Sequence, residues 1–190
     1  KIRESIRNSE IVFIAVGTPT RRGDGHADLK YVYKVAEEVS QHLDGYTVIV
    51  DKSTVPVGTA REVERIIRKN NRDADFDVVS NPEFLREGSA IEDFMKPDRV
   101  ILGVESERAE KKLRDLYSPS ALNKSQILVT DLESAELIKY ASNAFLATKI
   151  SFINEMSLLC EKTGANIESV AKGMGLDSRI GEKFLKTGPG

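Results

Sequence analysis

The stretch Thr130–Gly164, TDLESAELIKYASNAFLATKISFINEMSLLCEKTG, is typical of one long helix. Thr130 and Glu133 have the Thr-x-x-Glu spacing of a capping box, and Gly164 stands where a left-handed C-terminal cap is expected. No proline or glycine interrupts the run before Gly164. At about 1.5 Å per residue, the helix would be roughly 50 Å long, which is more than one small domain needs.

The predicted helix is apolar over much of its circumference. Four apolar side chains recur at every seventh position, at Ile138, Phe145, Phe152 and Leu159. Others widen this band, namely Leu137, Ala141, Ala144 and Ile153. A helix of this kind is buried from several sides, and exposed apolar patches of that size are uncommon on monomers. We therefore expect a homodimer in which the helix packs against its copy.

Two polar residues interrupt the apolar band. Lys139 and Asn143 are four positions apart, so an ammonium and a carboxamide lie next to each other on one helix face. Together they could hold a developing oxyanion. The structural alternative is that Lys139 extends to solvent and Asn143 is an ordinary surface residue.

The composition is that of a globular protein. The chain has 190 residues, 40% hydrophobic and 31% charged, with a formal net charge of −2. The balance of acids and bases argues against a nucleic-acid surface. No apolar run approaches the roughly 20 residues that span a membrane, and no signal segment opens the chain. We expect a cytoplasmic protein without a membrane partner.

The only cysteine, Cys160, cannot form an internal disulfide. It lies among Met156, Leu158 and Leu159 near the end of the long helix. A core thiol is the favoured interpretation, and a reactive thiol is the alternative.

The chain before the long helix alternates between apolar strands and amphipathic helices. The strand Ile11–Val16, IVFIAV, is apolar at every position, as in a parallel strand covered on both faces. The other predicted strands are Thr47–Asp51, Phe76–Ser80, Arg99–Val104 and Gln126–Thr130, and the helices are Lys1–Asn8, Asp28–Leu43, Thr59–Asn70, Ser106–Tyr117 and Asn166–Gly173. This alternation predicts an α/β fold with a doubly wound parallel sheet over residues 1–130, followed by a helical segment over residues 131–190.

Polar turns follow three of the predicted strands. They are Gly17–Thr20, Ser53–Thr59 and Asn81–Glu87. In open parallel sheets, ligands bind beyond the carboxyl ends of the strands, so these turns are candidates for a binding site. Each can also be purely structural, because Thr-Pro and Asn-Pro start turns and Thr59 can cap a helix.

The motifs resemble those of the UDP-glucose 6-dehydrogenase group in the UDP-glucose/GDP-mannose dehydrogenase family. The resemblance covers nearly the whole chain. It rests on VGTPT (16–20), KSTVPVGT (52–59), NPEFLREGSAIEDF (81–94), PDRVILG (97–103), ELIKYASNAFLATKISFINE (136–155) and SRIGEKFLKTGPG (178–190).

The resemblance implies an activity. Members of this group oxidise the C6 hydroxyl of UDP-glucose twice, reduce two NAD and release UDP-glucuronate. A cysteine holds the aldehyde as a thiohemiacetal and then as a thioester, which water hydrolyses. The expected cofactor is therefore NAD, the expected substrate is UDP-glucose, and no metal ion is expected.

The resemblance also assigns roles to residues. It places Lys139 and Asn143 at the oxyanions, and Lys139 also in proton transfer. The remaining catalytic residues are Thr54, Glu83 and Glu87: the resemblance places Thr54 and Glu87 near the nicotinamide and the hydrolytic water, and Glu83 as a further carboxylate in the same site. Thr18 and Pro19 would border the cofactor. Besides Glu83, Lys139 and Asn143, the substrate would contact Phe84, Leu85, Arg86, Phe184 and Lys186 of one subunit and Arg179 of the other. A desolvated lysine whose pKa falls toward neutrality suits either role of Lys139.

Two family features are not found among these residues. The family opens with a Gly-x-Gly-x-x-Gly turn that binds the pyrophosphate and with an acidic residue for the ribose. Its catalytic cysteine comes a few residues after the turn that matches 188–190, and Cys160 does not replace it. The chain thus resembles the middle of the enzyme, without the first part of the cofactor domain and without the C-terminal sugar-nucleotide domain. By itself it is expected to be inactive.

Two alternatives stay open. One is a related dehydrogenase that acts on GDP-mannose or a UDP-N-acetylhexosamine with the same chemistry. The other is a non-catalytic dimerisation segment, which the long helix and the missing cysteine favour.

Overall fold

The computed structural model describes residues 2–86, 88–121 and 126–189. The chain forms two compact units, Lys1–Lys139 and Tyr140–Gly190. The helix α6 begins in the first unit and continues through the second. No helix among the described residues is long and apolar enough to cross a membrane.

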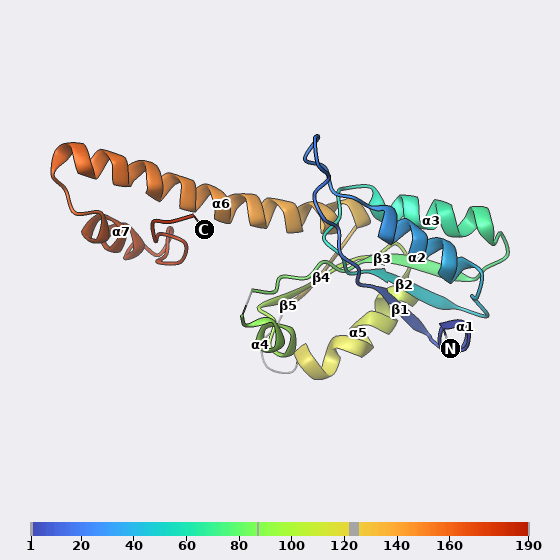
Figure 1. Ribbon diagram of the computed structural model, residues 1–190. Helices are drawn as coiled ribbons and strands as arrows, with labels where there is room; N and C mark the ends of the chain where they lie inside the picture. The colour runs from blue at the N-terminus through green and yellow to red at the C-terminus, as the bar shows by residue number, and fades with distance from the viewer. Residues whose placement is uncertain (1, 87, 122–125, 190) are drawn as a thin grey trace. The chain divides into compact units, whose positions relative to one another are not determined.

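The first unit is a sheet with helices on both faces (Figure 1). Its strands lie in the order β1-β2-β3-β4-β5, with bounds β1 Ile11–Ile14, β2 Thr47–Asp51, β3 Phe76–Ser80, β4 Arg99–Gly103 and β5 Gln126–Thr130. The helices are α1 Ile2–Arg7, α2 Lys30–Ser40, α3 Thr59–Asn70, α4 Ala90–Met95 and α5 Glu107–Ala121. The predicted α/β class is therefore confirmed.

The sheet is parallel except at one junction. β1, β2 and β3 pair in parallel, as do β4 and β5, but β3 and β4 are antiparallel and meet at Ser80 and Gly103. The connection that reverses the direction contains the short helix α4, which the periodicity did not predict.

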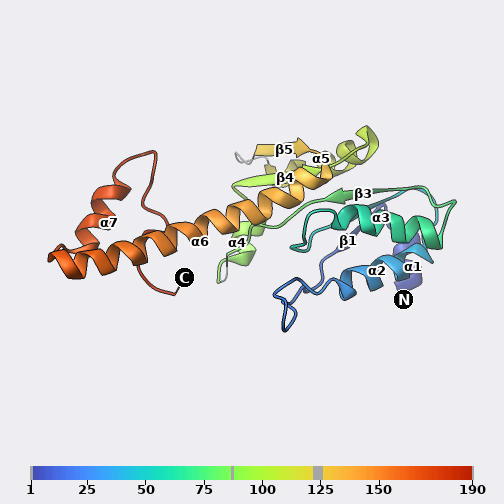
Figure 2. The ribbon, with the colours of Figure 1, turned by 90° about the horizontal axis from the view of Figure 1, so that it is seen from above.

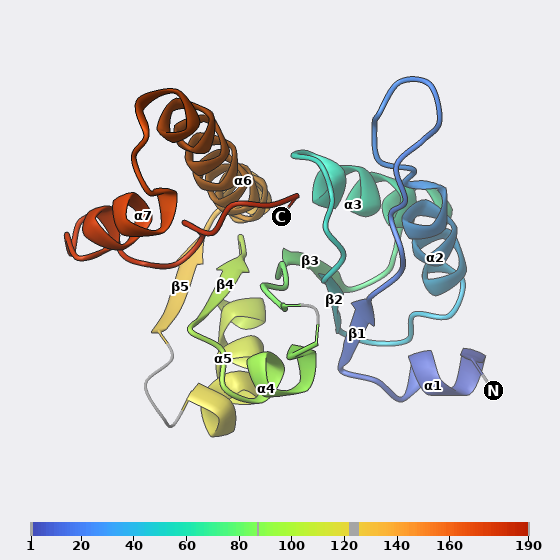
Figure 3. The ribbon, with the colours of Figure 1, turned by 60° about the vertical axis from the view of Figure 1, so that its left-hand side comes forward.

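Alternating side chains of the strands build two cores. Ile14, Ile49 and Val78 pack with α2 and α3 on one face, and these two helices run side by side (Figure 2). Val50 and Leu102 pack with α5 on the other face of the sheet. Figure 3 shows α5 below the strands. Strands covered on both faces explain the continuous apolar runs of the sequence.

The prediction for Ile11–Val16 was partly wrong. The strand ends at Ile14, and the Phe13 side chain is 39% exposed although Ile14 is fully buried. β1 is an edge strand beside β2, and Phe13 shares the lining of a cleft with Leu116 and Tyr117 of α5.

The long helix α6 spans Leu132–Thr163, and its predicted N-terminus needs correction. The cap is Asp131, whose Oδ1 accepts a hydrogen bond of 2.7 Å from the Ser134 amide. Thr130 is the last residue of β5, and Glu133 pairs with Arg61 instead of closing a capping box. The C-terminus is as expected.

Gly164 ends the helix with a φ of 76°, and its amide donates to the Cys160 carbonyl oxygen. At the other end of α6, the first turn packs directly on the end of β4. A Cβ atom on Gly103 would lie 2.6 Å from Ala135 Cβ and 2.8 Å from the Asp131 carbonyl oxygen. Only glycine allows this approach, which fixes the start of α6 against the sheet.

The second unit consists of the rest of α6, the helix α7 Ile167–Gly175 and the segment that follows it. Asn166 caps α7 by accepting a hydrogen bond from the Ser169 amide. The last segment returns to α6, where the Asn154 side chain donates to the Gly188 carbonyl oxygen at 2.8 Å and accepts from the Gly188 amide at 3.0 Å.

The apolar band of α6 is only partly covered within one chain. Ile153 is fully buried and Cys160 is 7% exposed, so Cys160 is a core thiol. Phe145 is 66% exposed, however, and Phe152 and Leu159 are about half exposed. The expectation that the helix is buried from several sides does not hold for a single chain.

Candidate functional site

A cleft of about 740 Å³ opens at the carboxyl ends of β1 and β2, in the first unit. This volume is within the roughly 300–1,000 Å³ of small-molecule sites. Its lining is mostly apolar with a few polar groups, and consists of Phe13, Ala15, Val16, Gly17, Thr18, Lys52, Ser53, Thr54, Glu83, Leu85, Phe94, Leu116 and Tyr117. The polar turns after β1, β2 and β3 therefore meet at one edge of the sheet.

Hydrogen bonds fix the turns after β1 and β2 to each other. The Ser53 hydroxyl accepts from the Val16 amide at 3.0 Å and donates to the Val16 carbonyl oxygen at 2.9 Å. The Thr18 hydroxyl donates to the Thr54 carbonyl oxygen at 2.8 Å. This part of the cleft wall is therefore preorganised.

The Glu83 carboxylate is the centre of a polar cluster. Its Oε1 atom accepts hydrogen bonds from Lys139 Nζ at 3.1 Å and from the Thr54 hydroxyl at 3.4 Å, and its Oε2 atom accepts from the Leu85 amide at 2.6 Å. Burial opposes ionisation of this carboxyl, but the Leu85 amide and the Lys139 ammonium outweigh it and lower the pKa of Glu83. Glu83 is therefore a carboxylate with two oriented oxygens.

Lys139 does not extend to solvent. It is 6% exposed, and its ammonium lies 5.2 Å from the centroid of the Phe84 ring in addition to its ion pair with Glu83. The surface interpretation of Lys139 is thus wrong. Three residues earlier on α6, the fully buried carboxylate of Glu136 accepts hydrogen bonds from the Gly58 and Ala60 amides.

Those two amides belong to the start of α3. Gly58 is the N-cap residue with a φ of 94°, and Thr59, considered as a possible cap, makes no side-chain cap but donates to the Pro56 carbonyl oxygen. The helix is therefore capped from outside, by Glu136.

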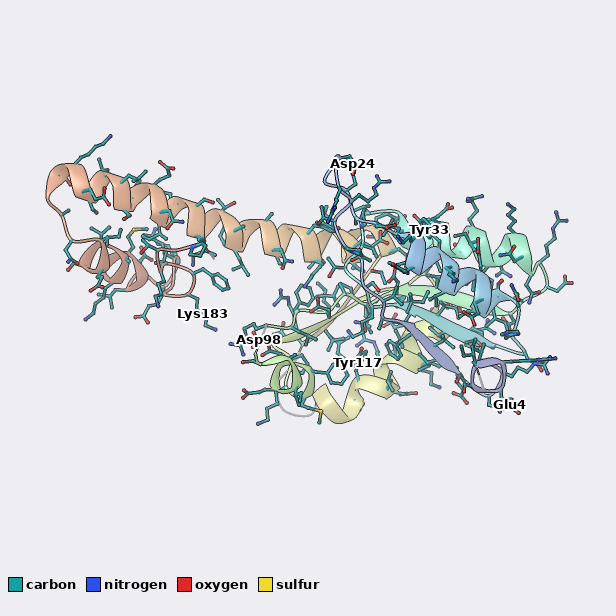
Figure 4. The ribbon with its side chains drawn as sticks, viewed as in Figure 1. Glu4, Asp24, Tyr33, Asp98, Tyr117 and Lys183 are labelled. Atoms are coloured by element: carbon teal, nitrogen blue, oxygen red, sulfur yellow. The ribbon has the colours of Figure 1, made fainter. Side chains whose placement is uncertain are left out.

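A further polar group lines the cleft at Lys52. Its ammonium lies 3.3 Å from both the carbonyl oxygen and the Oδ1 atom of Asn81, and the Tyr117 hydroxyl donates to the same Oδ1 at 2.5 Å. Tyr117 lies between α5 and the sheet (Figure 4). Burial lowers the pKa of Lys52 to about 8 and raises the pKa of Tyr117 to about 12.

Asp51, at the end of β2, is a buried carboxyl group. Its Oδ1 atom accepts from the Ser53 amide at 3.2 Å, whereas its Oδ2 atom has no hydrogen-bond partner. Burial raises the pKa of Asp51 to about 7, the Ser53 amide lowers it in part, and the nearby Glu136 raises it further. This group holds a proton over much of the acidic range.

The remaining predicted residues of the first unit lie around the cleft. Pro19 is exposed and does not line it, although its carbonyl oxygen accepts from the Asp28 amide. Arg86 is exposed and forms an ion pair of 2.6 Å with the mostly covered Asp93 of α4. The predicted residue Glu87 lies outside the described residues.

Four predicted residues belong to the second unit. Asn143 is exposed on α6, one turn after Lys139. Arg179 is exposed and pairs with Asp177, and Phe184 has a φ of 65°. Lys186 lines a second cleft of about 450 Å³ beside α7, and Leu185 next to it is buried.

Lys52, Asn81 and Glu136 lie within the motifs of the sequence, but their types and positions alone do not mark them as site residues. The available signals were the charged pair Asp51 and Lys52 at the end of a buried apolar strand, and Glu136 on the same helix face as Lys139. Lys52 and its partner Asn81 are 29 positions apart in sequence, and Glu136 and its partner Gly58 are 78 positions apart.

The cleft suits a nicotinamide cofactor. Apolar side chains can cover a flat aromatic ring, and the Thr18 and Thr54 side chains offer polar contacts beside it. At Gly17, a Cβ atom would meet nothing within 4 Å, so the backbone leaves open space there. When NAD is bound, it supplies a hydride acceptor.

The geometry defines a class of protein: an α/β ligand-binding unit whose cleft lies at the carboxyl ends of its strands. Comparison with known proteins gives the family. Residues 1–121 match the "UDP-glucose/GDP-mannose dehydrogenase family, NAD binding domain", and residues 133–190 match the central domain of the same family. The chain therefore belongs to the UDP-glucose/GDP-mannose dehydrogenase family, whose cofactor is NAD.

The curated relatives agree with this assignment. The chain is 60% identical to UDP-glucose 6-dehydrogenase of Rhizobium meliloti (strain 1021) and 54% identical to UDP-glucose 6-dehydrogenase TuaD of Bacillus subtilis (strain 168), over 100% of its length in each case. It covers 44% and 40% of these two proteins, so it spans about two fifths of their length.

Solved structures show the same fold. A UDP-glucose dehydrogenase from the archaeon Pyrobaculum islandicum superposes with a TM-score of 0.92 at 44% identity, over 99% of this chain and 44% of that one. A GDP-mannose dehydrogenase from Pseudomonas aeruginosa gives a TM-score of 0.87 at 29% identity, over 94% of this chain and 42% of that one.

Proposed function

We propose that the intact polypeptide carrying this sequence oxidises the C6 hydroxyl of UDP-glucose to UDP-glucuronate with NAD. The observation that carries the proposal is the ion pair of Lys139 and Glu83 at the wall of the cleft, with the Thr54 hydroxyl on the same carboxylate oxygen. An alcohol oxidation needs a group that accepts the hydroxyl proton and a positive charge for the developing oxyanion. A buried lysine beside a carboxylate can supply both.

Within this proposal each residue has a role. Lys139 stabilises the oxyanion and moves the proton, and Asn143, one turn later on α6, adds a carboxamide donor. Glu83 holds Lys139 in place and, with Thr54, orients the water that hydrolyses the thioester. The cofactor would be bordered by Thr18, Pro19, Thr54 and Glu87.

The second oxidation requires a covalent adduct. A thiolate would add to the aldehyde carbon as a thiohemiacetal, that carbon would give the second hydride to a second NAD, and water would cleave the resulting thioester to the acid and the free thiol. Cys160 does not serve here, because it is buried in α6. The nucleophile would be a cysteine outside these 190 residues.

The sugar nucleotide would contact two loops of one subunit and one residue of another. The first loop carries Phe84, Leu85 and Arg86, and the second carries Phe184 and Lys186. Arg179 would come from a second copy of the chain. We propose a homodimer formed through α6, which the exposed apolar band at Phe145 and Phe152 supports. The cytoplasmic location stays a prediction.

The substrate is tested with a panel of sugar nucleotides. The intact enzyme, with NAD, is given UDP-glucose, GDP-mannose or a UDP-N-acetylhexosamine, and NADH formation is followed by absorbance. We expect the highest kcat/KM for UDP-glucose, with two NADH per UDP-glucose consumed. A higher kcat/KM for another sugar nucleotide would assign the substrate to that class, and no NADH with any of them would favour the non-catalytic alternative.

A further inference from the structure

The charges around Glu83 do not cancel. Lys139 forms an ion pair with Glu83, which is formally neutral. Lys52 lines the same cleft and interacts electrostatically with both Glu83 and Lys139. The three groups together carry one positive charge when all are ionised.

Lys52 is held in place by a residue that is itself fixed. Both hydrogen bonds of its ammonium that the structure describes go to Asn81, at 3.3 Å. The Asn81 side chain donates to the Ile101 carbonyl oxygen at 2.8 Å, and its backbone amide donates to the Asp51 carbonyl oxygen at 2.8 Å. Asn81 thus joins β2, β3 and β4, and Lys52 is anchored to the sheet.

This anchor is neutral, which is unusual for a desolvated ammonium. Removing an ammonium from water is costly unless an anion lies near it, and because the described hydrogen bonds of Lys52 go only to amide oxygens of Asn81, Glu83 is the anion that offsets this cost. Desolvation is the main cause that lowers the pKa of Lys52 to about 8, Glu83 opposes it, and Lys139 adds to it. Tyr117 reaches the same Asn81 oxygen from α5. A desolvated lysine that lines a cleft and has a lowered pKa is characteristic of a functional site.

We propose that Lys52 is a positioning residue for the oxidation described above: its ammonium is another cation beside Glu83, keeping that carboxylate ionised and paired with Lys139 while negative charge develops on the substrate oxygen. This inference rests on the proposed function. With Lys52 present, the three charged groups favour an oxyanion by a net positive charge. Without it, Lys139 and Glu83 offer only a neutral pair.

The kinetic test compares Lys52→Met with Lys52→Arg in the intact enzyme. We expect Lys52→Met to lower kcat by about tenfold or more with little change in KM, because the interaction is realised in the transition state. The acid limb of the kcat/KM profile should move to higher pH, since Glu83 loses a charge that favours its ionised form. Lys52→Arg should recover part of kcat because it keeps the charge.

Lys112→Met is the matched control, because Lys112 pairs with the exposed Glu10 and does not line the cleft. We expect it to leave kcat and the pH profile unchanged. A wild-type kcat and pH profile in Lys52→Met would overturn the proposal, as would equal losses in Lys52→Met and Lys52→Arg, since charge would then not be the cause.

A second measurement needs no turnover. The lysines are dimethylated with ¹³C-formaldehyde, and the Lys52 signal is identified as the one missing in Lys52→Arg. We expect this signal to titrate below the exposed lysines. Its midpoint should fall further in Glu83→Gln, which removes a favourable anion, and rise in Lys139→Met, which removes a like charge.

A Lys52 midpoint unchanged by either substitution would overturn the proposal, because a lysine that merely supports Asn81 would not respond to them. The two readouts also separate the inference from the function on which it rests. If the wild-type enzyme oxidises no sugar nucleotide, the proposed function falls, and the titration alone decides whether Lys52 acts on Glu83.

Discussion

The carboxylate of Glu136 in α6 accepts a hydrogen bond of 2.6 Å from the amide of Gly58, the N-cap residue of α3. Its other oxygen accepts from the Ala60 amide at 2.8 Å. The same helix presents Lys139 one turn later to Glu83. α6 therefore caps the helix that follows the Thr54 turn and delivers the lysine of the cleft, so the cap and the ion pair depend on one placement of α6.

Replacing Glu136 should destabilise the first unit. In Glu136→Gln the side-chain NH₂ group cannot accept a hydrogen bond, so at least one buried amide of α3 is left unpaired. We expect a loss of about 2 kcal/mol in the free energy of unfolding, measured by urea titration. The control is Glu133→Gln, which removes a half-exposed ion pair with Arg61 and should cost below about 1 kcal/mol. Equal losses in both variants would contradict this role of Glu136.

The raised pKa of Asp51 should make the stability of the folded chain depend on pH. Its pKa is about 7 in the folded chain and 3.8 as the ordinary value, so between these pH values the folded state binds more protons than the unfolded state. Stability from this group is therefore complete below about pH 4 and is lost as the pH rises toward 7. At about 1.4 kcal/mol per pKa unit, the loss is at most roughly 4 kcal/mol.

The measurement compares wild type with Asp51→Asn, which keeps the shape but cannot ionise. Unfolding free energies at a series of pH values should show wild type losing stability relative to Asp51→Asn between pH 4 and 7. A constant difference over this range would show that Asp51 is ionised in the folded protein at all these values.

The strands and most helices of the fold follow from local sequence. The apolar runs Thr47–Asp51 and Phe76–Ser80 are bounded by turn residues, and the structure has strands with the same bounds. The start of α6 could not be decided in this way. Thr130 and Asp131 are both good N-cap residues. The choice between them depends on Arg61, which is distant in sequence and donates a hydrogen bond to Glu133, so that Glu133 does not close a capping box with Thr130.

The candidate site was predictable as a set of turns but not as a set of contacts. The order of strands brings the turns after β1, β2 and β3 to one edge, and the motifs name Thr54 and Glu83 there. The pairing of Lys139 with Glu83 joins residues 56 positions apart, and no local pattern shows it. The anchoring of Lys52 by Asn81 is hidden for the same reason.

Lys139 should be needed for catalysis. In the intact enzyme, we expect Lys139→Met to lower kcat by about 100-fold or more with little change in substrate KM, which is the usual scale for an acid, base or oxyanion group. Lys69→Met, on the exposed end of α3, is the control and should keep wild-type kcat. A near-normal kcat for Lys139→Met would leave Lys139 with a structural role only.

The apolar band of α6 should hold two copies of the intact protein together. Light scattering is expected to give the mass of a dimer. Phe145→Glu places a charge on a side chain that is 66% exposed in a single chain, and should shift the mass toward a monomer. Glu155→Lys, an exposed polar position of the same helix, is the control. A monomeric wild type would refute the dimer.

The 190 residues produced by themselves should form no NADH from UDP-glucose and NAD. No Gly-x-Gly-x-x-Gly turn occurs among them, so the pyrophosphate lacks the amides of a helix N-terminus, and NAD should bind weakly. Their only cysteine is 7% exposed inside α6, so no thiolate can hold the aldehyde for a second oxidation. The assay follows absorbance at the NADH band beside the intact enzyme, with the fold of the shorter chain checked by circular dichroism. Two NADH per UDP-glucose from the 190 residues alone would mean that the oxidation needs neither a Gly-x-Gly-x-x-Gly turn nor a further cysteine.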